Sequence, residues 1–294
     1  MINFLLSLIR FFLNFLKLFL KLLLVISIPA LAMIYTYNSY QIPSLDKEWN
    51  FDQTILPTIN FSGNLIIIND LRSFEYNSTT DYKALVYDEN YDLDKIESLY
   101  YIIEPFSEFD GPAHTMLSFG FSDGKYLVVS AEIRKEVGES FSAFKGLVNQ
   151  YELVYMLGDE TDFIKLRANY RKDDVIMYPI KTSKENISKL FVSMLERADK
   201  LTKEPEFYNT IFNNCTTNIY EHVNVIREIT NKEKISWSIN TFLPSHSDEN
   251  IYELGLIDTS LPLEEAREYY KINELSEKYA DSKDYSKAIR KERK

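Results

Sequence analysis

The stretch HTMLSFGFSDGKYLVVSAEI, residues 114–133, decides the fold expected for this chain, because it holds two alternating runs around a turn signal, Ser122-Asp123-Gly124. Apolar side chains recur at every second position, which is the period of a half-buried β-strand. A three-residue hairpin loop at the turn places His114 directly opposite Glu132. Directly opposed residues have Cβ atoms about 5 Å apart, so this register predicts that the Glu132 carboxylate holds the His114 imidazole.

The two faces of the predicted hairpin differ in polarity, which supports this register. The apolar face carries Thr115, Leu117, Phe119, Phe121, Leu127, Val129 and Ile133, and the polar face carries His114, Ser118, Ser130 and Glu132. A loop one residue shorter or longer would break the facing. The alternative interpretation is that His114 caps a strand and that Glu132 is a surface carboxylate.

Cys215 is the only cysteine among 294 residues, and it stands in Asn213-Asn214-Cys215-Thr216-Thr217-Asn218 before a helix-like run. A lone thiol has no internal disulfide partner and cannot form a cysteine-rich metal site, so it is either an inert buried thiol or a nucleophile. The neighbouring Thr and Asn residues are typical of a helix N-terminus. Free N–H groups and the helix dipole stabilise a thiolate there, so we expect Cys215 to have a depressed pKa.

Together these residues predict a cysteine triad. Cys215 is the candidate nucleophile, His114 the candidate base, and Glu132 the group that orients the imidazole ring. The main-chain N–H of Cys215 is a candidate oxyanion donor. The other candidates for oxyanion binding and support are the side chains of Asn213, Asn214 and Arg134.

The other two histidines fit this constellation less well. His222 lies seven residues after Cys215 on the same predicted helix, about 10 Å along its axis, and is interpreted as a partly buried helix residue. His246 lies in a loop and is the reserve base, with Asp248 beside it. A metal site built from the three histidines remains an alternative, but no HExxH-type spacing supports it, and no Gly-rich phosphate loop indicates nucleotide chemistry. We therefore expect no metal and no cofactor.

Composition narrows the class of protein further. The net charge is −11 and no basic stripe is present, so a nucleic-acid partner is not expected. About 250 residues follow the apolar N-terminal segment, enough for one large domain. A hydrophobic content of 45% and an aromatic content of 14% are sufficient for a substantial core.

Residues 1–37 are expected to anchor the chain in a membrane. The cations within this apolar segment, which lie on one helical stripe, are Arg10, Lys17 and Lys21. This pattern predicts a basic amphipathic helix running into a span from Leu22 to about Tyr37, with the N-terminus in the cytoplasm and the main domain outside. The alternative is a cleaved signal peptide with Ala30-Leu31-Ala32 as the recognition site. In both cases the domain is exported, and an unpaired cysteine in an oxidising compartment favours a chemical role.

The rest of the chain is predicted to comprise a polar linker at 38–62, an exported domain at 63–260 and a charged helical tail at 261–294. The basic end of the tail, from Arg290 onward, is expected to be solvated, with contact to anionic lipid as the alternative. Strand-like runs lie at 65–68, 82–87, 99–103, 115–121, 126–133, 153–157 and 175–180. A helix is predicted over 183–201 from its apolar spacing and capping residues, and a second helix is predicted from Cys215 onward.

Several short runs, in one order over about residues 62–258, resemble a known family. They are Arg72, Phe74 and Tyr76; Ala113-His114-Thr115; Ser118-Phe119-Gly120-Phe121; Ser130-Ala131-Glu132-Ile133-Arg134; Gly138-Glu139; Tyr151-Glu152-Leu153; Pro205-Glu206-Phe207-Tyr208-Asn209-Thr210; Asn213-Asn214-Cys215-Thr216-Thr217-Asn218; Leu243-Pro244; Ser247-Asp248; and Gly255-Leu256-Ile257-Asp258. These runs are similar to the Lnb-type lipoprotein N-acyltransferases of bacteria. The resemblance implies an α+β, permuted papain-like (NlpC-type) cysteine domain, in which an antiparallel sheet with the His-bearing strands precedes the Cys-bearing helix.

By the same resemblance, Cys215 and His114 are the nucleophile and the base, whereas the role of Glu132 rests on the hairpin count. The implied activity is transfer of a fatty acyl chain from a phospholipid, through a Cys215 thioester, to the α-amino group of a lipoprotein's lipidated N-terminal cysteine. The implied partners are a phospholipid donor, a lipoprotein acceptor and the membrane. Two alternatives remain: an exported cysteine hydrolase acting on cell-wall peptide or lipid ester, and an exported binding module with an inert Cys215.

Overall fold

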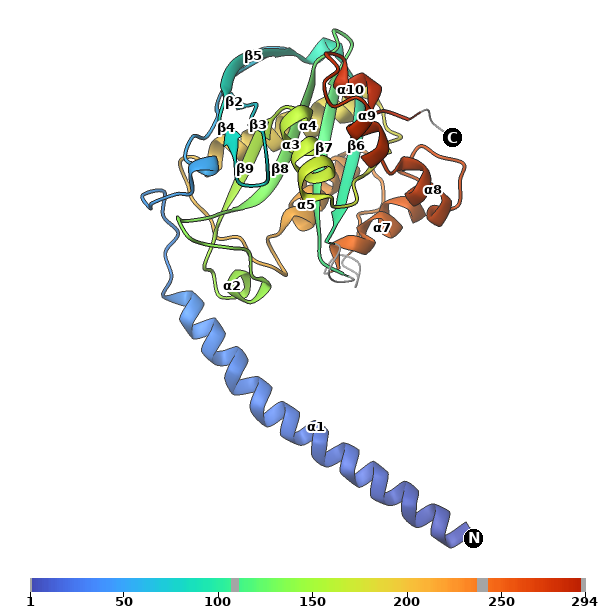
Figure 1. Ribbon diagram of the computed structural model, residues 1–294. Coiled ribbons are helices and arrows are strands. Elements are labelled where there is room, and N and C mark those ends of the chain that lie inside the picture. The colour runs from blue at the N-terminus through green and yellow to red at the C-terminus, as the bar shows by residue number, and fades with distance from the viewer. Residues whose placement is uncertain (1, 107–110, 237–242, 292–294) are drawn as a thin grey trace.

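The computed structural model describes residues 2–106, 111–236 and 243–291, and in it a long N-terminal helix leads into an α+β domain (Figure 1). The helix α1 (Ile2–Ser39) is continuous, and most of its apolar side chains from Phe4 onward are exposed. Within the described residues it is the one helix long and apolar enough to cross a membrane. The expected basic region and the expected apolar span are therefore two parts of one helix.

The domain is built on a mixed sheet. The sheet has eight strands within the described residues, in the order β1-β2-β9-β8-β7-β6-β10, with β5 also paired to β2. The strands are β1 (Thr58–Ser62), β2 (Leu65–Arg72), β5 (Val86–Asp92), β6 (Ile96–Pro105), β7 (Ala113–Phe121), β8 (Tyr126–Arg134), β9 (Glu152–Gly158) and β10 (Ile176–Pro179), and the short strands β3 (Glu75–Tyr76) and β4 (Tyr82–Lys83) form a separate pair.

One junction in the sheet is parallel, which corrects the expectation of an antiparallel sheet. β2 and β9 pair in parallel at Arg72 and Gly158, whereas the other neighbouring strands are antiparallel. The alternation of apolar residues indicates which face of a strand is buried, but it carries no information on the direction of the neighbouring strand.

The central hairpin has the predicted register. β7 and β8 pair as a three-residue loop requires, and the Phe121 N–H donates to the Lys125 carbonyl at 3.0 Å to close that loop. Gly124 has a φ of +89°, in the region that glycine enters without a steric penalty. The register places His114 and Glu132 on one face of the sheet, with Nε2 of the imidazole 3.6 Å from Oε1 of the carboxylate.

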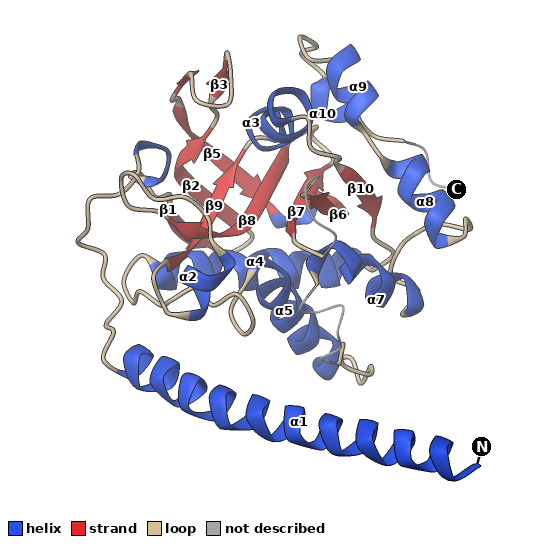
Figure 2. Ribbon diagram, turned by 60° about the horizontal axis from the view of Figure 1, so that its bottom comes forward, coloured by secondary structure: helices blue, strands red, loops and turns tan. Residues whose placement is uncertain are grey.

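Helices cover both faces of this sheet (Figure 2). One face is covered by α4 (Lys184–Leu201) and α5 (Cys215–Ile229), and the other by α3 (Glu160–Lys165), the π-helical segment η3 (Leu166–Arg171), α9 (Asn273–Lys278) and α10 (Tyr285–Ala288). The remaining helical elements are α2 (Ala143–Leu147), α7 (Ser247–Glu253), α8 (Leu263–Tyr270) and the short turns η1 (Phe51–Gln53), η2 (Leu93–Lys95) and η4 (Pro244–His246). The predicted helices over 183–201 and from Cys215 are thereby confirmed as α4 and α5.

Each face of the sheet has its own hydrophobic core. On the α4 side, Phe119 and Phe121 pack edge-on against Phe191 of α4. On the opposite side, Met116 and Phe163 belong to a second buried cluster. Polar residues at one end of this second side, among them His114, are therefore set beside an apolar core instead of in open water.

The segment 38–62 is docked on the domain, which corrects the expectation of a linker. Residues 58–62 form the edge strand β1. The guanidinium of Arg134 lies 4.1 Å from the centroid of the Trp49 ring and donates to the carbonyl of the buried Gln53 at 3.2 Å. The polar composition of this segment predicts a linker. The prediction fails because the segment is held by contacts with residues far away in the sequence, which a local sequence pattern does not reveal.

The C-terminal segment is also part of the domain. Tyr270 and Tyr285 are buried within it. Arg290 donates to both carboxylate oxygens of Glu160, at 2.7 and 2.9 Å, and its guanidinium lies 3.6 Å from the centroid of the Tyr126 ring. The expected solvated end is therefore wrong for Arg290, because a buried carboxylate distant in sequence neutralises its charge; residues 292–294 lie outside the described residues.

Candidate active site

Cys215 is the first residue of α5, and a capping box sets its position. The Asn214 side chain accepts a hydrogen bond from the Thr217 N–H at 2.9 Å, and the Thr217 hydroxyl accepts one from the Asn214 N–H at 2.8 Å. These reciprocal bonds satisfy two donors at the start of the helix. The Cys215 N–H thus belongs to the first turn, where N–H groups have no acceptor within the helix and the dipole favours negative charge.

A serine hydroxyl joins His114 to Glu132. Nε2 of His114 lies 2.6 Å from Oγ of Ser130, and Ser130 donates to Oε1 of Glu132 at 3.0 Å. Because the single hydroxyl proton goes to Glu132, Nε2 must carry the proton that it donates to Ser130. This tautomer leaves Nδ1 with a lone pair, and within the described residues no group hydrogen-bonds to that nitrogen.

Arg167 in η3 links Glu132 to a second buried carboxylate. Its Nη2 donates to Oε1 of Glu132 at 3.1 Å, and its Nε donates to Oε2 of Glu104 at 2.6 Å. Glu104 is fully buried and stands directly opposite His114 in the β6–β7 ladder. One guanidinium therefore holds carboxylates on the two strands that flank His114.

These surroundings keep the imidazole neutral. Burial, followed by the positive charge of Arg167, lowers the pKa of His114 to about 3. Burial alone raises the pKa of Glu132, but Arg167 and then His114 bring the pKa of this carboxyl down to about 2. At neutral pH the pair is a neutral imidazole beside an ionised carboxylate, and Nδ1 can accept a proton.

The sheet opens between β7 and β8 at the end that carries His114. The β7–β8 ladder stops at Leu117 and Val129, whereas β7 stays paired with β6 as far as Ala113 and β8 with β9 as far as Arg134. A pocket with a cavity volume of about 170 Å³ lies at this opening. Its lining includes Glu104, Phe106, Ala113, His114, Ala131, Glu132, Phe141, Arg167, Tyr208 and Cys215. The opening lets the thiol, from the α5 side of the sheet, share a pocket with His114 from the other side.

The Cys215 thiol is buried, with 4% of the residue exposed. Sγ lies 4.0 Å from Oγ1 of Thr216, which is itself 3.1 Å from Oγ1 of Thr115. Burial raises the pKa of the thiol and outweighs the hydrogen bonds of Thr115 and Thr216, which lower it. The expected depressed pKa is therefore wrong for this arrangement, because the first turn of a helix does not compensate a thiolate for its lost hydration. Within the described residues, Sγ makes no hydrogen bond with His114.

The candidate supporting residues Asn213, Asn214 and Arg134 do not line the pocket. Their side chains bind the main chain of neighbouring segments. The Asn213 amide donates to the Phe207 carbonyl and the Asn214 amide to the Thr210 carbonyl, each at 2.8 Å. The Arg134 guanidinium donates to the Gln53 carbonyl and lies over the Trp49 ring. Of the candidate oxyanion donors, the Cys215 N–H is thus the one that belongs to a pocket residue.

His222 and the reserve residues, His246 and Asp248, also lie outside the pocket. His222 is enclosed between two hydroxyl groups at 3.0 and 2.7 Å, which confirms its interpretation as a buried helix residue. Nδ1 of His246 lies 2.9 Å from a carboxylate oxygen of Glu249, and buried Asp248 pairs with Arg267 at 2.8 Å. The described part of the chain contains no group of three or more His, Cys, Asp or Glu residues that could hold a metal ion.

A family model described as the Lnb N-terminal periplasmic domain matches residues 83–246, more than half of the chain. The chain belongs to the Lnb family. The matched segment contains Cys215, His114, Ser130 and Glu132. No curated protein and no solved structure matches the chain. A periplasmic Lnb domain together with the apolar helix α1 fits a membrane-anchored protein with an extracytoplasmic domain.

Sequence motifs did not indicate all the residues of this Lnb-family pocket. Glu104 follows the predicted strand 99–103 directly, and a charged residue at the end of an apolar run is the signal that points to it. Arg167 has no comparable signal, because its contact with Glu132 depends on how η3 packs on the sheet. Ser130 lies on the face that the alternation predicts, but no sequence pattern indicates that its hydroxyl lies between the imidazole and the carboxylate.

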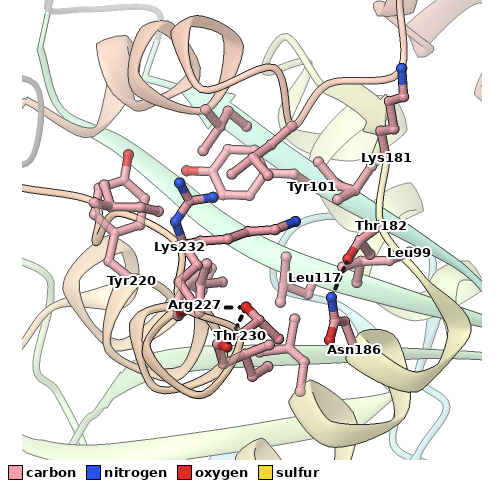
Figure 3. Close-up of a pocket in the computed structure, with 18 residues that line it drawn as sticks. Leu99, Tyr101, Leu117, Lys181, Thr182, Asn186, Tyr220, Arg227, Thr230 and Lys232 are labelled. Carbon is pink, nitrogen blue, oxygen red and sulfur yellow. Dashed lines mark hydrogen bonds between the residues drawn. The ribbon is translucent and has the colours of Figure 1, made fainter.

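A second, more apolar pocket lies along α5 (Figure 3). Its cavity volume is about 80 Å³. Its apolar lining includes Leu99, Leu117, Leu190, Ile219, Val223 and Ile226. Ile219 stands one helical turn after Cys215, so this Lnb domain places a hydrocarbon-lined space next along the helix that begins with the thiol. Lys181, Arg227 and Lys232 also line it, and none of the predicted site residues does.

Proposed function

We propose that this chain is a membrane-anchored thiol acyltransferase that moves a fatty acyl chain from a phospholipid, through a Cys215 thioester, to the α-amino group of a lipoprotein's lipidated N-terminal cysteine. One observation carries the proposal: Cys215, His114 and Glu132 line a single pocket of an Lnb-family domain, and Ser130 links the imidazole to the carboxylate. These groups are the nucleophile, base and orienting group that covalent acyl transfer needs. The order β7, β8, α5 also supports a permuted papain-like arrangement as part of the proposal.

The first half-reaction makes the thioester. The thiol turns from Thr115 and Thr216 towards the imidazole, and Nδ1 of His114 takes its proton while Sγ attacks the ester carbonyl carbon. The carbonyl oxygen gains the negative charge, and the Cys215 N–H donates to it. Collapse of this adduct breaks the ester C–O bond, and His114 returns the proton to the departing lysophospholipid oxygen. A neutral His114, which its lowered pKa supports, is the state that this step requires.

The second half-reaction transfers the acyl group to nitrogen. The neutral α-amine attacks the thioester carbonyl, the C–N bond forms, and the C–S bond breaks. The proton lost by the nitrogen passes through His114 to the departing sulfur, which restores the thiol. Ester and amine are thereby converted to alcohol and amide, with no water consumed. Ser130 stays hydrogen-bonded to the ring throughout, and the Glu132 carboxylate behind it stabilises the transient positive charge of the ring.

The second pocket supports a lipid substrate over a cell-wall peptide. Its lining is predominantly apolar and begins one helical turn after Cys215, so a hydrocarbon chain is the complementary occupant. A peptide would instead need groups that pair with its main-chain N–H and C=O groups. The apolar helix α1 supports the same choice, because it would hold the domain where phospholipids and lipoproteins are concentrated.

Intact-mass spectrometry of the full-length protein tests this proposal. After incubation with phospholipid in detergent, we expect a mass increase of one fatty acyl group that hydroxylamine removes. Because Cys215 is the only cysteine, a hydroxylamine-sensitive adduct that is absent from Cys215→Ala must be the thioester. No such adduct on the native protein, or an equal one on the variant, overturns the proposal.

A discharge experiment separates the transferase from the hydrolase. A diacylated lipopeptide with a free amino terminus should remove the acyl group and become triacylated. The same lipopeptide with a blocked amine should leave the adduct in place. Rapid loss to water with release of free fatty acid, in the presence of either peptide, would instead identify a hydrolase.

A further inference from the structure

Three exposed apolar residues form a projecting lip between β8 and β9. Val137, Phe141 and Phe144 have 59%, 48% and 64% of their surface exposed, and they lie on the segment that contains α2. Isolated exposed apolar residues are ordinary on a protein surface, but neighbouring ones on one short projecting segment indicate a contact surface. We call Val137, Phe141 and Phe144 the lip.

The lip belongs to the rim of the candidate active site. Phe141 lines the pocket that contains Cys215, and its ring meets that of Phe106, another lining residue, at 6.2 Å in an edge-on contact. On its other side the lip adjoins the membrane helix. Phe144 lines a groove together with residues of α1 that include Met33, and Figure 1 shows α2 beside the end of α1 that joins the domain.

Hydrogen bonds fix the lip relative to that end of α1. The Asn38 side chain, in the last turn of α1, donates to the Leu147 carbonyl of α2 at 2.9 Å. Beyond the helix, the Ser44 N–H donates to the Glu152 carboxylate at the start of β9, at 3.0 Å. The hydroxyl of Thr210, near the Cys215 helix, donates to the Ala143 carbonyl at 2.7 Å. The end of α1, the lip and the segment before Cys215 are thus tied together by direct contacts.

The level of the membrane surface follows from α1. Its apolar span reaches Tyr37, and Tyr35, Tyr37 and Tyr40 are exposed near its end, as is typical of aromatic residues at a membrane–water interface. Phe144 lines a groove together with residues of this same part of α1. The lip therefore lies at the depth of the lipid headgroups and the first acyl carbons, where apolar side chains are stabilised by insertion.

We propose that the lip inserts into the outer face of the bilayer and that the Cys215 pocket opens directly onto the lipids there. The acyl donor then reaches the thiol without leaving the membrane for bulk water. In its statement about the substrate this inference rests on the proposed acyltransfer, whereas the contact of the lip with lipid does not depend on any reaction. The two can therefore be tested separately.

Site-directed spin labelling tests the contact with lipid. Cys215→Ala removes the only native thiol, so Phe144→Cys in that background gives a single labelling site on the full-length protein. Leu65→Cys is the matched control, because Leu65 is also apolar and 39% exposed but begins β2, whose first residues lie at the sheet end that carries the β7–β8 turn. In phosphatidylglycerol–phosphatidylethanolamine vesicles, the label at 144 should be relaxed by oxygen and shielded from a water-soluble nickel complex, and the label at 65 should show the reverse. Equal access of the nickel complex to both labels overturns the inference.

A kinetic comparison tests the route of the substrate. Val137→Ser together with Phe144→Ser weakens insertion without changing a residue that lines the pocket. Adduct formation on Cys215 from vesicle phospholipid should fall roughly tenfold. The free energy of burying one large apolar side chain in the membrane changes the binding equilibrium by about this factor. Adduct formation from a water-soluble short-chain thioester should be unchanged. Equal losses with both donors overturn the lip's role in delivery, whereas no adduct from either donor with the native protein overturns the proposed function and leaves the spin-label result valid.

Discussion

Ser130 carries a single hydroxyl proton, and that proton decides which nitrogen of His114 can act as a base. The hydroxyl donates to Glu132 and must therefore accept from Nε2, so the free lone pair is on Nδ1. A direct contact of Glu132 with the ring, at 3.6 Å, would be a weaker constraint. The serine is thus a positioning residue that acts through His114.

Removal of this hydroxyl should slow acylation while the fold is retained. Ser130→Ala leaves Nε2 without its acceptor and frees the ring to turn, so the rate of Cys215 adduct formation should fall about tenfold or more, a part of the 10²–10⁴ that a positioned base contributes. Ser118→Ala is the control, because that hydroxyl is equally buried on the same face but is bound to Glu160. Both rates are measured by intact mass, and a similar loss in the two variants would show that only packing was disturbed.

The thiol itself should behave as a protonated, buried group until substrate arrives. Since burial raises the pKa of Cys215, its alkylation by iodoacetamide should still accelerate as the pH passes the ordinary cysteine value of about 8.5. Thr115→Val, which removes a hydroxyl that lowers this pKa, should shift the profile further upward. A rate that levels off below neutral pH would contradict the buried arrangement and favour a resting thiolate.

At the scale of elements, the sequence predicted what depends on local patterns. The β7–β8 hairpin followed from period-two alternation and one turn signal, and α5 followed from the capping residues around Cys215. The opening of the sheet between β7 and β8 could not be predicted, because it depends on β8 following β9 while β7 follows β6. The sequence does not predict the position of Arg167 either, because that position results from the packing of η3 on strands far away in the sequence.

Arg167 should be the strongest single tie between η3 and the sheet. Arg167→Met leaves Glu104 and Glu132 as buried carboxylates without their main cation, and breaking a buried pair in this way costs about 3–5 kcal/mol of unfolding free energy. Lys172→Met, at the exposed Lys172–Glu277 pair just beyond η3, should cost less than about 1 kcal/mol. Urea unfolding of both variants gives the comparison, and equal stabilities would show that the carboxylates are satisfied without Arg167.

For the whole molecule, the site and the membrane anchor form one connected unit. The segment after α1, expected to be a linker, is hydrogen-bonded to the start of β9. The C-terminal helices α9 and α10 cover the sheet face on which Arg167 binds Glu104 and Glu132. Residues 38–62, 63–260 and 261–291, which composition alone would separate, therefore fold together. A consequence is that many ionisable groups are buried at once, and the stability of the whole domain depends on their protonation.

Acidification should destabilise the domain first through its histidines. Burial lowers the pKa of His222 to about 4, and that of His114 is about 3, whereas an unfolded histidine titrates near 6.5. Between these values the unfolded chain binds protons that the folded chain does not, so the free energy of unfolding falls as the pH drops below about 6.5. Glu132, with a folded pKa of about 2, adds its loss only below about pH 4.5. Glu104 and Asp159, whose pKa values burial raises, oppose the trend.

Because these contributions overlap in the native protein, the difference between variants is the informative quantity. His222→Gln retains hydrogen bonding to the neighbouring hydroxyls but cannot titrate, so it should remove on the order of 2 kcal/mol of the destabilisation between pH 7 and pH 5. Glu132→Gln should lower the stability by a similar amount at pH 7, 6 and 5, because Arg167 loses one of its carboxylates, and should therefore leave the change between pH 7 and pH 5 as it is in the native protein. Thermal unfolding of the full-length protein in detergent at pH 7, 6 and 5 measures both effects. A His222→Gln curve parallel to that of the native protein would mean that His222 takes up its proton without unfolding, and that its enclosure between Tyr155 and Ser193 is looser than the hydrogen bonds indicate.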